Sequence, residues 1–190
     1  MSNYETAKHI LQQIDPSASF RPQLAGEWRG DFPLPEALLE YYRMFGPVDL
    51  TIRGYGNPYF LPGLAKLWPY QAGYRYDAHT RQRFPDWEDD WLAIADQGAD
   101  PFILSVSRGA VLHAFHGEGN WQPVELFTGP SEMVETLAIL RQILASAGSV
   151  FKNPDATIRA EFRHEARQAV EELTGSVARA ATILTRLGWS

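Results

Sequence analysis

The sequence predicts an α+β fold, in which an antiparallel sheet is wrapped by helices, with a long helical extension at its C-terminal side. Four short apolar runs between Trp91 and Phe127 are separated by short turns that each contain glycine, a pattern typical of an antiparallel meander. Segments with apolar residues at helical spacing precede and follow this region. The 190 residues suffice to bury a core, and the hydrophobic share of 45% is that of a globular protein.

Two helices are predicted before the meander. The first is expected over residues 4–14, after a capping box formed by Ser2 and Glu5. The second begins near Pro35, which suits the first turn of a helix, and it stops at Gly46. The expected apolar stripe of this second helix comprises Leu38, Leu39, Tyr42 and Phe45.

The region between the second helix and the meander is predicted to be mostly irregular. Residues 48–52 alternate as a strand does. Residues 54–73 combine four glycines and three prolines with several aromatic residues, so we expect irregular structure held by rings. One turn of helix is expected at residues 64–67, and most of the rings are expected to belong to the core.

The meander is predicted to contain four strands, and a helix follows it. The strands are expected at residues 91–95, 102–106, 110–115 and 122–127. The helix begins near Pro130, and its apolar face is expected to comprise Met133, Leu137, Leu140, Ile143 and Leu144. This helix closes the first predicted domain, residues 1–150.

Residues 151–190 are predicted to form a second unit, a C-terminal amphipathic helical extension. Their apolar residues step by three and four positions, and Gly175 is expected to break the helix in two. The extension pairs two chains, docks on a partner, or folds back over its own sheet, and folding back is the favoured alternative. The predicted seam comprises Ile158, Phe162, Ala166, Ala169, Leu173, Val177, Ala180, Leu184 and Leu187.

The composition excludes several classes of function. Without Cys, the chain has no disulfide, thiolate zinc site, iron–sulfur cluster or cysteine nucleophile. The net charge of −6 argues against direct binding of nucleic acid, and the acidic excess lies in residues 1–150. The sequence has neither a signal-peptide pattern nor an apolar run of membrane-spanning length, so we expect a cytoplasmic protein without a membrane partner.

No catalytic motif stands out, and we expect a protein that is not an enzyme and holds neither cofactor nor metal. The sequence lacks a nucleophile elbow and a phosphate loop. His113 and His116 would point to opposite faces of a regular strand, so one core histidine and one turn histidine are favoured over a metal pair. An enzyme that uses these histidines with Glu118 is the least favoured hypothesis.

The most unusual charge feature is a run of six carboxylates between positions 86 and 100, with no Lys or Arg between Phe84 and Arg108. This run is a solvated loop, a calcium site without EF-hand spacing, or a docking surface for a basic protein. In a docking surface, the carboxylates would steer the partner and the flanking Trp rings would supply buried area. The candidate partner-binding residues are Asp86, Trp87, Glu88, Asp89, Asp90, Asp96, Asp100 and Glu118.

Four short motifs occur in a fixed order over residues 34–144. They are a helix that opens with Leu34-Pro35 and ends before Gly46, a strand pair from Trp91 to Pro101, the strand start Gly109-Ala110-Val111, and a closing segment from His116 to Leu144. In this order they resemble the SUKH superfamily, which includes fungal cell-wall synthesis regulators and many bacterial immunity proteins. The family is usually described with glycine where this chain has Ala95 and Ala99.

The resemblance implies an α+β domain with a non-enzymatic role. Many bacterial members of the family bind and neutralise toxins, often nucleases. A close alternative to the SUKH resemblance is a domain of similar layout that occurs in immunity proteins against secreted nucleases. The family supplies no binding residues, because the binding face varies with the toxin. The acidic residues 1–150 agree with a basic partner.

The expected function is therefore neutralisation of a basic protein toxin by steric and electrostatic occlusion. The alternative is a regulatory or scaffold protein whose C-terminal helix serves self-association or partner docking. The sequence leaves open whether the chain is a monomer or a homodimer.

Overall fold

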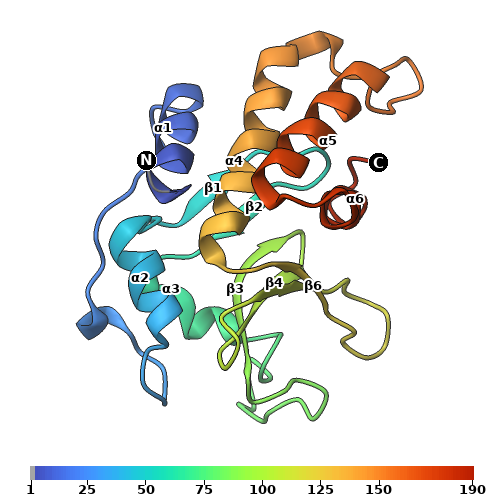
Figure 1. The fold of residues 1–190 in the computed structure, drawn as a ribbon. Coiled ribbons are helices and arrows are strands. Elements are labelled where there is room, and N and C mark those ends of the chain that lie inside the picture. Colours follow the sequence, from blue (N-terminus) through green and yellow to red (C-terminus); the bar gives the residue numbers. More distant parts are fainter. Residues whose placement is uncertain (1–2) are drawn as a thin grey trace.

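The six strands lie in the sheet in the order in which they follow one another along the chain (Figure 1). The computed structural model describes residues 3–190, and every neighbouring pair of strands is antiparallel. The fold is α+β, and the predicted meander is confirmed. The strands are β1 (Leu50–Ile52), β2 (Tyr59–Leu61), β3 (Trp91–Gln97), β4 (Asp100–Ser105), β5 (Val111–His113) and β6 (Val124–Phe127).

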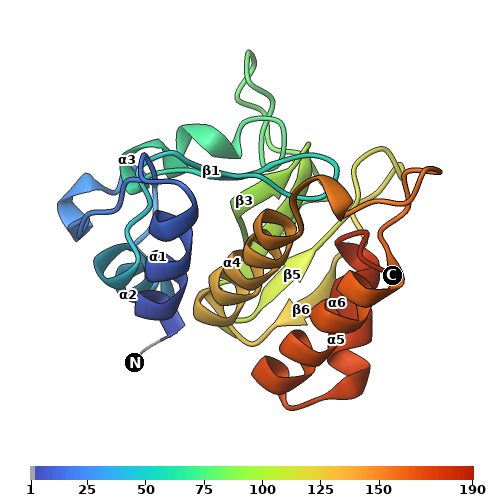
Figure 2. The ribbon, with the colours of Figure 1, turned by 90° about the horizontal axis from the view of Figure 1, so that it is seen from above.

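The helices gather mainly on one face of the sheet, with α4 at the centre of their layer (Figure 2). On one side α4 packs against α1, and on the other side it packs against α5. Short 3₁₀ turns lie at Ala25–Glu27, Pro69–Gln71 and Gly148–Val150. The helices are α1 (Asn3–Ile14), α2 (Glu36–Met44), α3 (Leu64–Leu67), α4 (Pro130–Ala147), α5 (Ala160–Thr174) and α6 (Val177–Arg186).

The elements before the meander differ from the prediction at two points. Leu39 is 39% exposed, and Tyr41 takes its place in the buried stripe of α2, because positions three and four apart share a helix face. Strand β2 lies where irregular structure was expected, and its pairing with β1 and β3 is what makes it a strand. Ser2 of the predicted capping box lies outside the described residues.

The two faces of the sheet belong to two separate apolar clusters. Along β3, Leu92 and Ile94 face the large core under the helices, whereas Trp91 and Ala93 face a smaller cluster on the other side. This alternation is the two-residue period of a strand. The register shifts between Ala93 and Ala95, so Ala95 also joins the large core.

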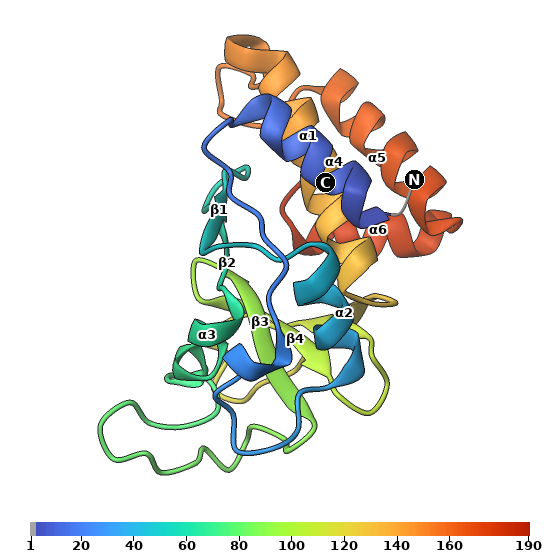
Figure 3. The same ribbon diagram turned by 90° about the vertical axis from the view of Figure 1, so that its left-hand side faces the viewer.

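The smaller cluster is covered by the loop of residues 68–90 and by Trp121. Figures 1 and 3 show this loop at the end of the molecule opposite the helical layer. The ring of Trp87 lies edge-on against those of Trp91 and Trp121, at centroid distances of 5.7 and 5.5 Å. Tyr74 adds a third ring against Trp87. Both faces of the central strands β3 and β4 are thereby largely removed from water.

The loop is fastened to the sheet by the buried amide of Gln71. Strand β2 pairs with β3 at Asp96 and Gln97, and it does not reach Ala93. There the Gln71 side chain accepts from the Ala93 N–H (2.9 Å) and donates to the Ala93 carbonyl (2.8 Å). Gln71 thus replaces the missing strand, since buried backbone groups need partners.

The C-terminal extension folds back onto the rest of the chain. Gly175 adopts a left-handed conformation, with φ of 64°, and separates α5 from α6 as predicted. Helix α5 packs on α4, helix α6 packs on β6, and Trp189 is buried in the same core as the N-terminal helix. The predicted seam is wrong at Val177, which is 65% exposed, and the buried face of α6 passes through Ile183 instead. One apolar cluster therefore spans residues from both predicted units.

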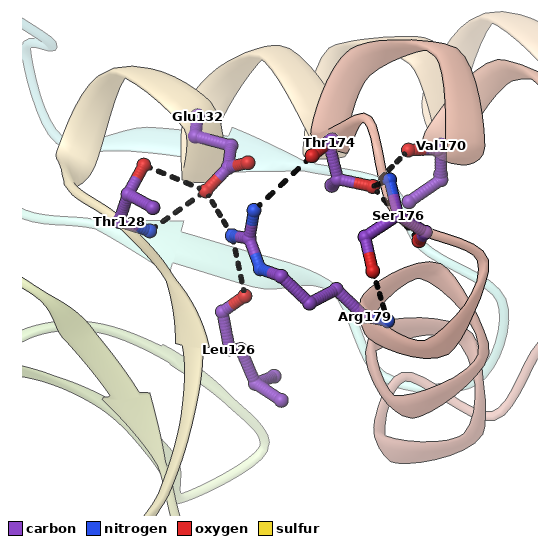
Figure 4. A network of polar contacts seen from close by, with 7 residues as sticks. All are labelled: Leu126, Thr128, Glu132, Val170, Thr174, Ser176 and Arg179. Carbon is purple, nitrogen blue, oxygen red and sulfur yellow. Dashed lines mark hydrogen bonds and ion pairs between the residues drawn. The ribbon is translucent and has the colours of Figure 1, made fainter.

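An ion pair ties α6 to the start of α4 (Figure 4). The Glu132 carboxylate is nearly buried, and it accepts from Arg179 Nη2 at 2.6 Å. The same carboxylate oxygen accepts from the backbone N–H and the hydroxyl of Thr128, at 2.7 and 2.9 Å. A buried carboxylate is tolerated here because all three contacts stabilise its charge.

One apolar segment in the described part of the chain, Pro130–Val150, meets the length and composition of a membrane-spanning helix. It comprises α4 and the 3₁₀ turn that follows. Since α4 is covered by α1, α5 and the sheet, its apolar character is explained by its place in the core. That arrangement agrees with a soluble protein.

The Arg179→Met variant is expected to lower the free energy of unfolding by about 2 kcal/mol, because it leaves the buried Glu132 with fewer partners. The expected loss is below that of a fully buried pair, since Arg179 is partly exposed. Urea unfolding at pH 7 measures it. The matched control is Arg163→Met on the exposed face of α5, which is expected to change stability by less than about 0.5 kcal/mol. Equal losses in both variants would contradict the role of the ion pair.

Candidate functional site

Two of the predicted partner-binding carboxylates hold the covering loop in place. Asp89 forms an ion pair with Arg83 and lies 3.8 Å from Nη2 of Arg75. The hydrogen bond and charge of Arg83 hold the pKa of Asp89 below its usual value. Asp90 accepts from the Ser105 hydroxyl at 2.5 Å and from the Ser107 N–H at 2.7 Å.

The environment of Asp90 combines opposing influences on its pKa. Partial burial raises the pKa of this carboxyl, but the hydrogen bonds from Ser105 and Ser107 outweigh it, and the pKa is lowered. These bonds connect the end of the loop to the turn after β4. Asp90 is therefore a structural residue of the loop.

Asp96 and Asp100 are also bonded within the fold. Asp96 accepts from the hydroxyls of Tyr70 and Tyr74, the second at 3.2 Å. Asp100 accepts from the backbone N–H of His116 at 2.8 Å and lies 2.6 Å from Nδ1 of the same residue. Asp96 thus supports the cover of the sheet, and Asp100 fixes the start of the loop at residues 115–121.

Trp87 cannot serve as a docking residue, and this prediction is wrong. Only 2% of its surface is exposed, because its ring fills the centre of the smaller apolar cluster. Its indole N–H donates to the carbonyl of Trp91 at 3.0 Å. A Trp beside carboxylates suggested an exposed ring, but the sheet face behind it is the better place for its apolar area.

Three of the eight predicted residues remain on the surface without a partner. Within residues 3–190, the side chains of Asp86, Glu88 and Glu118 have neither a hydrogen bond nor an ion pair. Asp86 and Glu118 line a hollow of about 310 Å³ between the covering loop and the loop that joins β5 to β6. Glu88 is exposed two residues from Asp86. The name acidic hollow is used below for this hollow together with the three carboxylates.

Two aromatic residues missed by the sequence analysis complete the acidic hollow. Phe115 and Trp121 are half-buried and line it beside three residues with small or uncharged side chains, Gly117, Gly119 and Asn120. Trp121 also packs on Trp87, so its ring is held rigidly. The available signal was the aromatic pair that flanks Glu118 in the sequence.

The two histidines of the region are separated, as expected. His113 is fully buried between the rings of Phe102 and Phe115, whereas His116 is exposed beside Asp100. In the described part of the chain, no three His, Asp or Glu side chains are grouped so that they could hold a metal ion. Four of the six carboxylates in the run are bonded to separate partners, and the described residues group no set of carboxylates for calcium.

Comparisons of the chain with protein-family models, with curated proteins and with solved structures found no match.

The buried His113 predicts a dependence of stability on pH. Burial lowers its pKa to about 4, against an ordinary value of 6.5. Between these values the unfolded chain binds a proton that the folded chain does not, so stability falls as the pH falls through this window, by up to about 3 kcal/mol. The loss of stability is complete below the pKa of His113 in the folded protein.

Unfolding in urea at pH 7, 6, 5 and 4 measures this contribution. The His113→Leu variant lacks it, so its stability is expected to fall less over this range than that of the unchanged protein. His116→Leu serves as the exposed control. Parallel curves for the unchanged protein and His113→Leu would contradict the assignment.

Proposed function

We propose that this chain is a non-enzymatic protein-binding domain of the bacterial cytoplasm that neutralises a basic protein toxin, with nucleases the leading class. The observation that carries the proposal is the acidic hollow, a depression lined by two unpaired carboxylates and two aromatic residues, with a third exposed carboxylate two residues from Asp86. The resemblance of residues 34–144 to the SUKH superfamily supports the same role. The bonded aspartates take no part in binding.

The acidic hollow suits a cationic side chain presented by a protein. The carboxylates of Asp86, Glu88 and Glu118 attract a basic surface over a range set by salt, and they raise the association rate. The ring of Trp121 provides apolar contact area for the aliphatic stem of a Lys or Arg. The Phe115 ring contributes less, because the Arg186 guanidinium already lies over it, 4.7 Å from its centroid. A partner seated here has its own basic surface covered, and a nuclease would lose access to a polyanionic substrate.

The second candidate function, regulation through the C-terminal helices, has less support. The apolar residues of α5 and α6 are largely buried against α4 and β6, so they are not free to pair with another chain. The outward face of α5 carries exposed charged residues, including Arg163 and Arg167. A docking role would have to use this polar face.

Capture from a lysate of the producing organism tests the proposal with three baits. They are the unchanged protein, the triple variant Asp86→Asn/Glu88→Gln/Glu118→Gln, and the control Glu165→Gln/Glu171→Gln/Glu172→Gln on α5. Both variants lose three carboxylates. The unchanged protein and the control are expected to capture the same basic protein in equal amounts to the bait, and less of it at high salt. The triple variant is expected to capture at least about tenfold less.

The captured protein is then purified, and its toxicity or nuclease activity is measured with each bait added. Inhibition by the unchanged protein and the control, but not by the triple variant, is the expected result. Equal inhibition by the triple variant would disprove the acidic hollow as the binding surface. Capture of no basic protein under conditions that express the toxin would disprove the function.

A further inference from the structure

A second pocket, lined by three arginines, lies on the other part of the covering loop. Its volume is about 250 Å³, and its walls are Asp31, Trp68, Arg75, Tyr76, Arg81 and Arg83. We call it the arginine pocket. It shares no lining residue with the acidic hollow. Three guanidinium groups in one pocket are notable in a chain of net charge −6.

Arg75 is the buried member of the arginine pocket, with 7% of its surface exposed. Its Nη1 donates to the carbonyls of Asp89 and Trp91, at 3.2 and 2.9 Å. Its Nη2 has only the distant Asp89 carboxylate, at 3.8 Å, and forms no hydrogen bond in the described structure. One edge of a nearly buried guanidinium thus lines the pocket with unused donors.

The charge of Arg75 is poorly compensated. Burial and the neighbouring charge of Arg83 lower its pKa, and Asp31 and Asp89 only partly offset them. Asp89 is itself engaged by Arg83. An anion bound in the pocket would relieve the remaining cost of burying this cation.

Arg81 is held at the pocket by a strained backbone. Its φ is 60°, which is uncommon for a residue other than glycine. Hydrogen bonds fix the turn of residues 77–81, which is the tip of the covering loop. The Asp77 side chain accepts from the N–H groups of His79 and Thr80, and the Arg81 N–H donates to the Asp77 carbonyl at 3.0 Å. The strained tip places the Arg81 guanidinium 4.8 Å above the Tyr76 ring.

We propose that the arginine pocket binds the phosphate group of a small organic phosphate, such as a sugar phosphate. Guanidinium groups donate pairs of parallel hydrogen bonds, which match the oxygens of phosphate. The pocket suits only a small ligand, since its volume lies just below the range of about 300–1,000 Å³ that is typical of ligand sites.

The aromatic walls favour a ligand without a base. Arg81 lies over Tyr76, and Arg75 lies over Trp68 and Phe32 at 5.8 and 5.7 Å. Trp68 is further enclosed by edge contacts with the rings of Trp28 and Phe32. These ring contacts are already made, which leaves little room for a nucleobase to stack. Nucleotides are therefore expected to bind no better than a sugar phosphate. Free phosphate carries the same phosphate group that the arginines would recognise, so it is expected to compete for the pocket.

Calorimetric titration at fixed pH and ionic strength tests the proposal. The probes are inorganic phosphate, glucose 6-phosphate, glucose, adenosine monophosphate and sulfate. We expect saturable binding of glucose 6-phosphate, weaker binding of phosphate, and none of glucose. Similar affinities for phosphate and its sugar ester would assign the site to the free ion.

Variants separate binding from folding. Glycine adopts a positive φ without strain, so Arg81→Gly is expected to retain the melting temperature and to weaken glucose 6-phosphate binding at least about tenfold. The control Arg163→Gln/Arg167→Gln removes two charges from α5, outside the pocket, and is expected to bind within about twofold of the unchanged protein.

Three results would overturn the proposal. They are the absence of binding to every phosphate tested, equal binding by Arg81→Gly, and equal affinity for sulfate and glucose 6-phosphate, which would indicate an adventitious ion only. The experiment needs no protein partner, so it is independent of the proposed function.

Discussion

The covering loop of residues 68–90 depends on polar bonds that fasten it to the sheet. The meander has two apolar faces, and the helices cover only one of them. The second face is buried because Gln71 pairs with Ala93 as a strand would, and because Asp90 bonds to Ser105 and Ser107 at the other end of the loop. Between Gln71 and Asp90, the side chains of Tyr74 and Trp87 pack on the second face of the sheet.

This fastening decides which charged residues are free to act. Asp89, Asp90, Asp96 and Asp100 are bonded to groups of the loop and its neighbours, whereas Asp86, Glu88 and Glu118 are not. The same loop presents the Asp86 carboxylate to the acidic hollow and three guanidinium groups to the arginine pocket. An acidic run in the sequence is therefore not one surface, but a structural set and a smaller exposed set.

Local patterns predicted much of the fold. The four strands of the meander, the helix after them and the break at Gly175 each follow from spacing within a few residues. Strand β2 was missed because only three residues pair there, with partners elsewhere in the chain. The shift from Leu39 to Tyr41 shows the same limit, since the buried face of α2 is set by what packs against it.

The candidate sites were predicted less well, for a physical reason. Charge and aromatic content are visible in a sequence, but hydrogen-bond partners are set by the tertiary fold. The Ser105 hydroxyl that engages Asp90 lies 15 positions away, and the Ala93 backbone that engages Gln71 lies 22 away. The sequence does not show the sheet face that the Trp87 ring covers, so the ring was predicted to be exposed.

The division between structural and exposed carboxylates is tested most directly by urea unfolding of two alanine variants. Asp90→Ala leaves the Ser107 N–H and the buried Ser105 hydroxyl without their acceptor, and it is expected to lower the free energy of unfolding by about 1–3 kcal/mol. Glu88→Ala, two residues away, is expected to change it by less than about 0.5 kcal/mol. Equal effects of the two variants, or a larger effect of Glu88→Ala, would contradict the account.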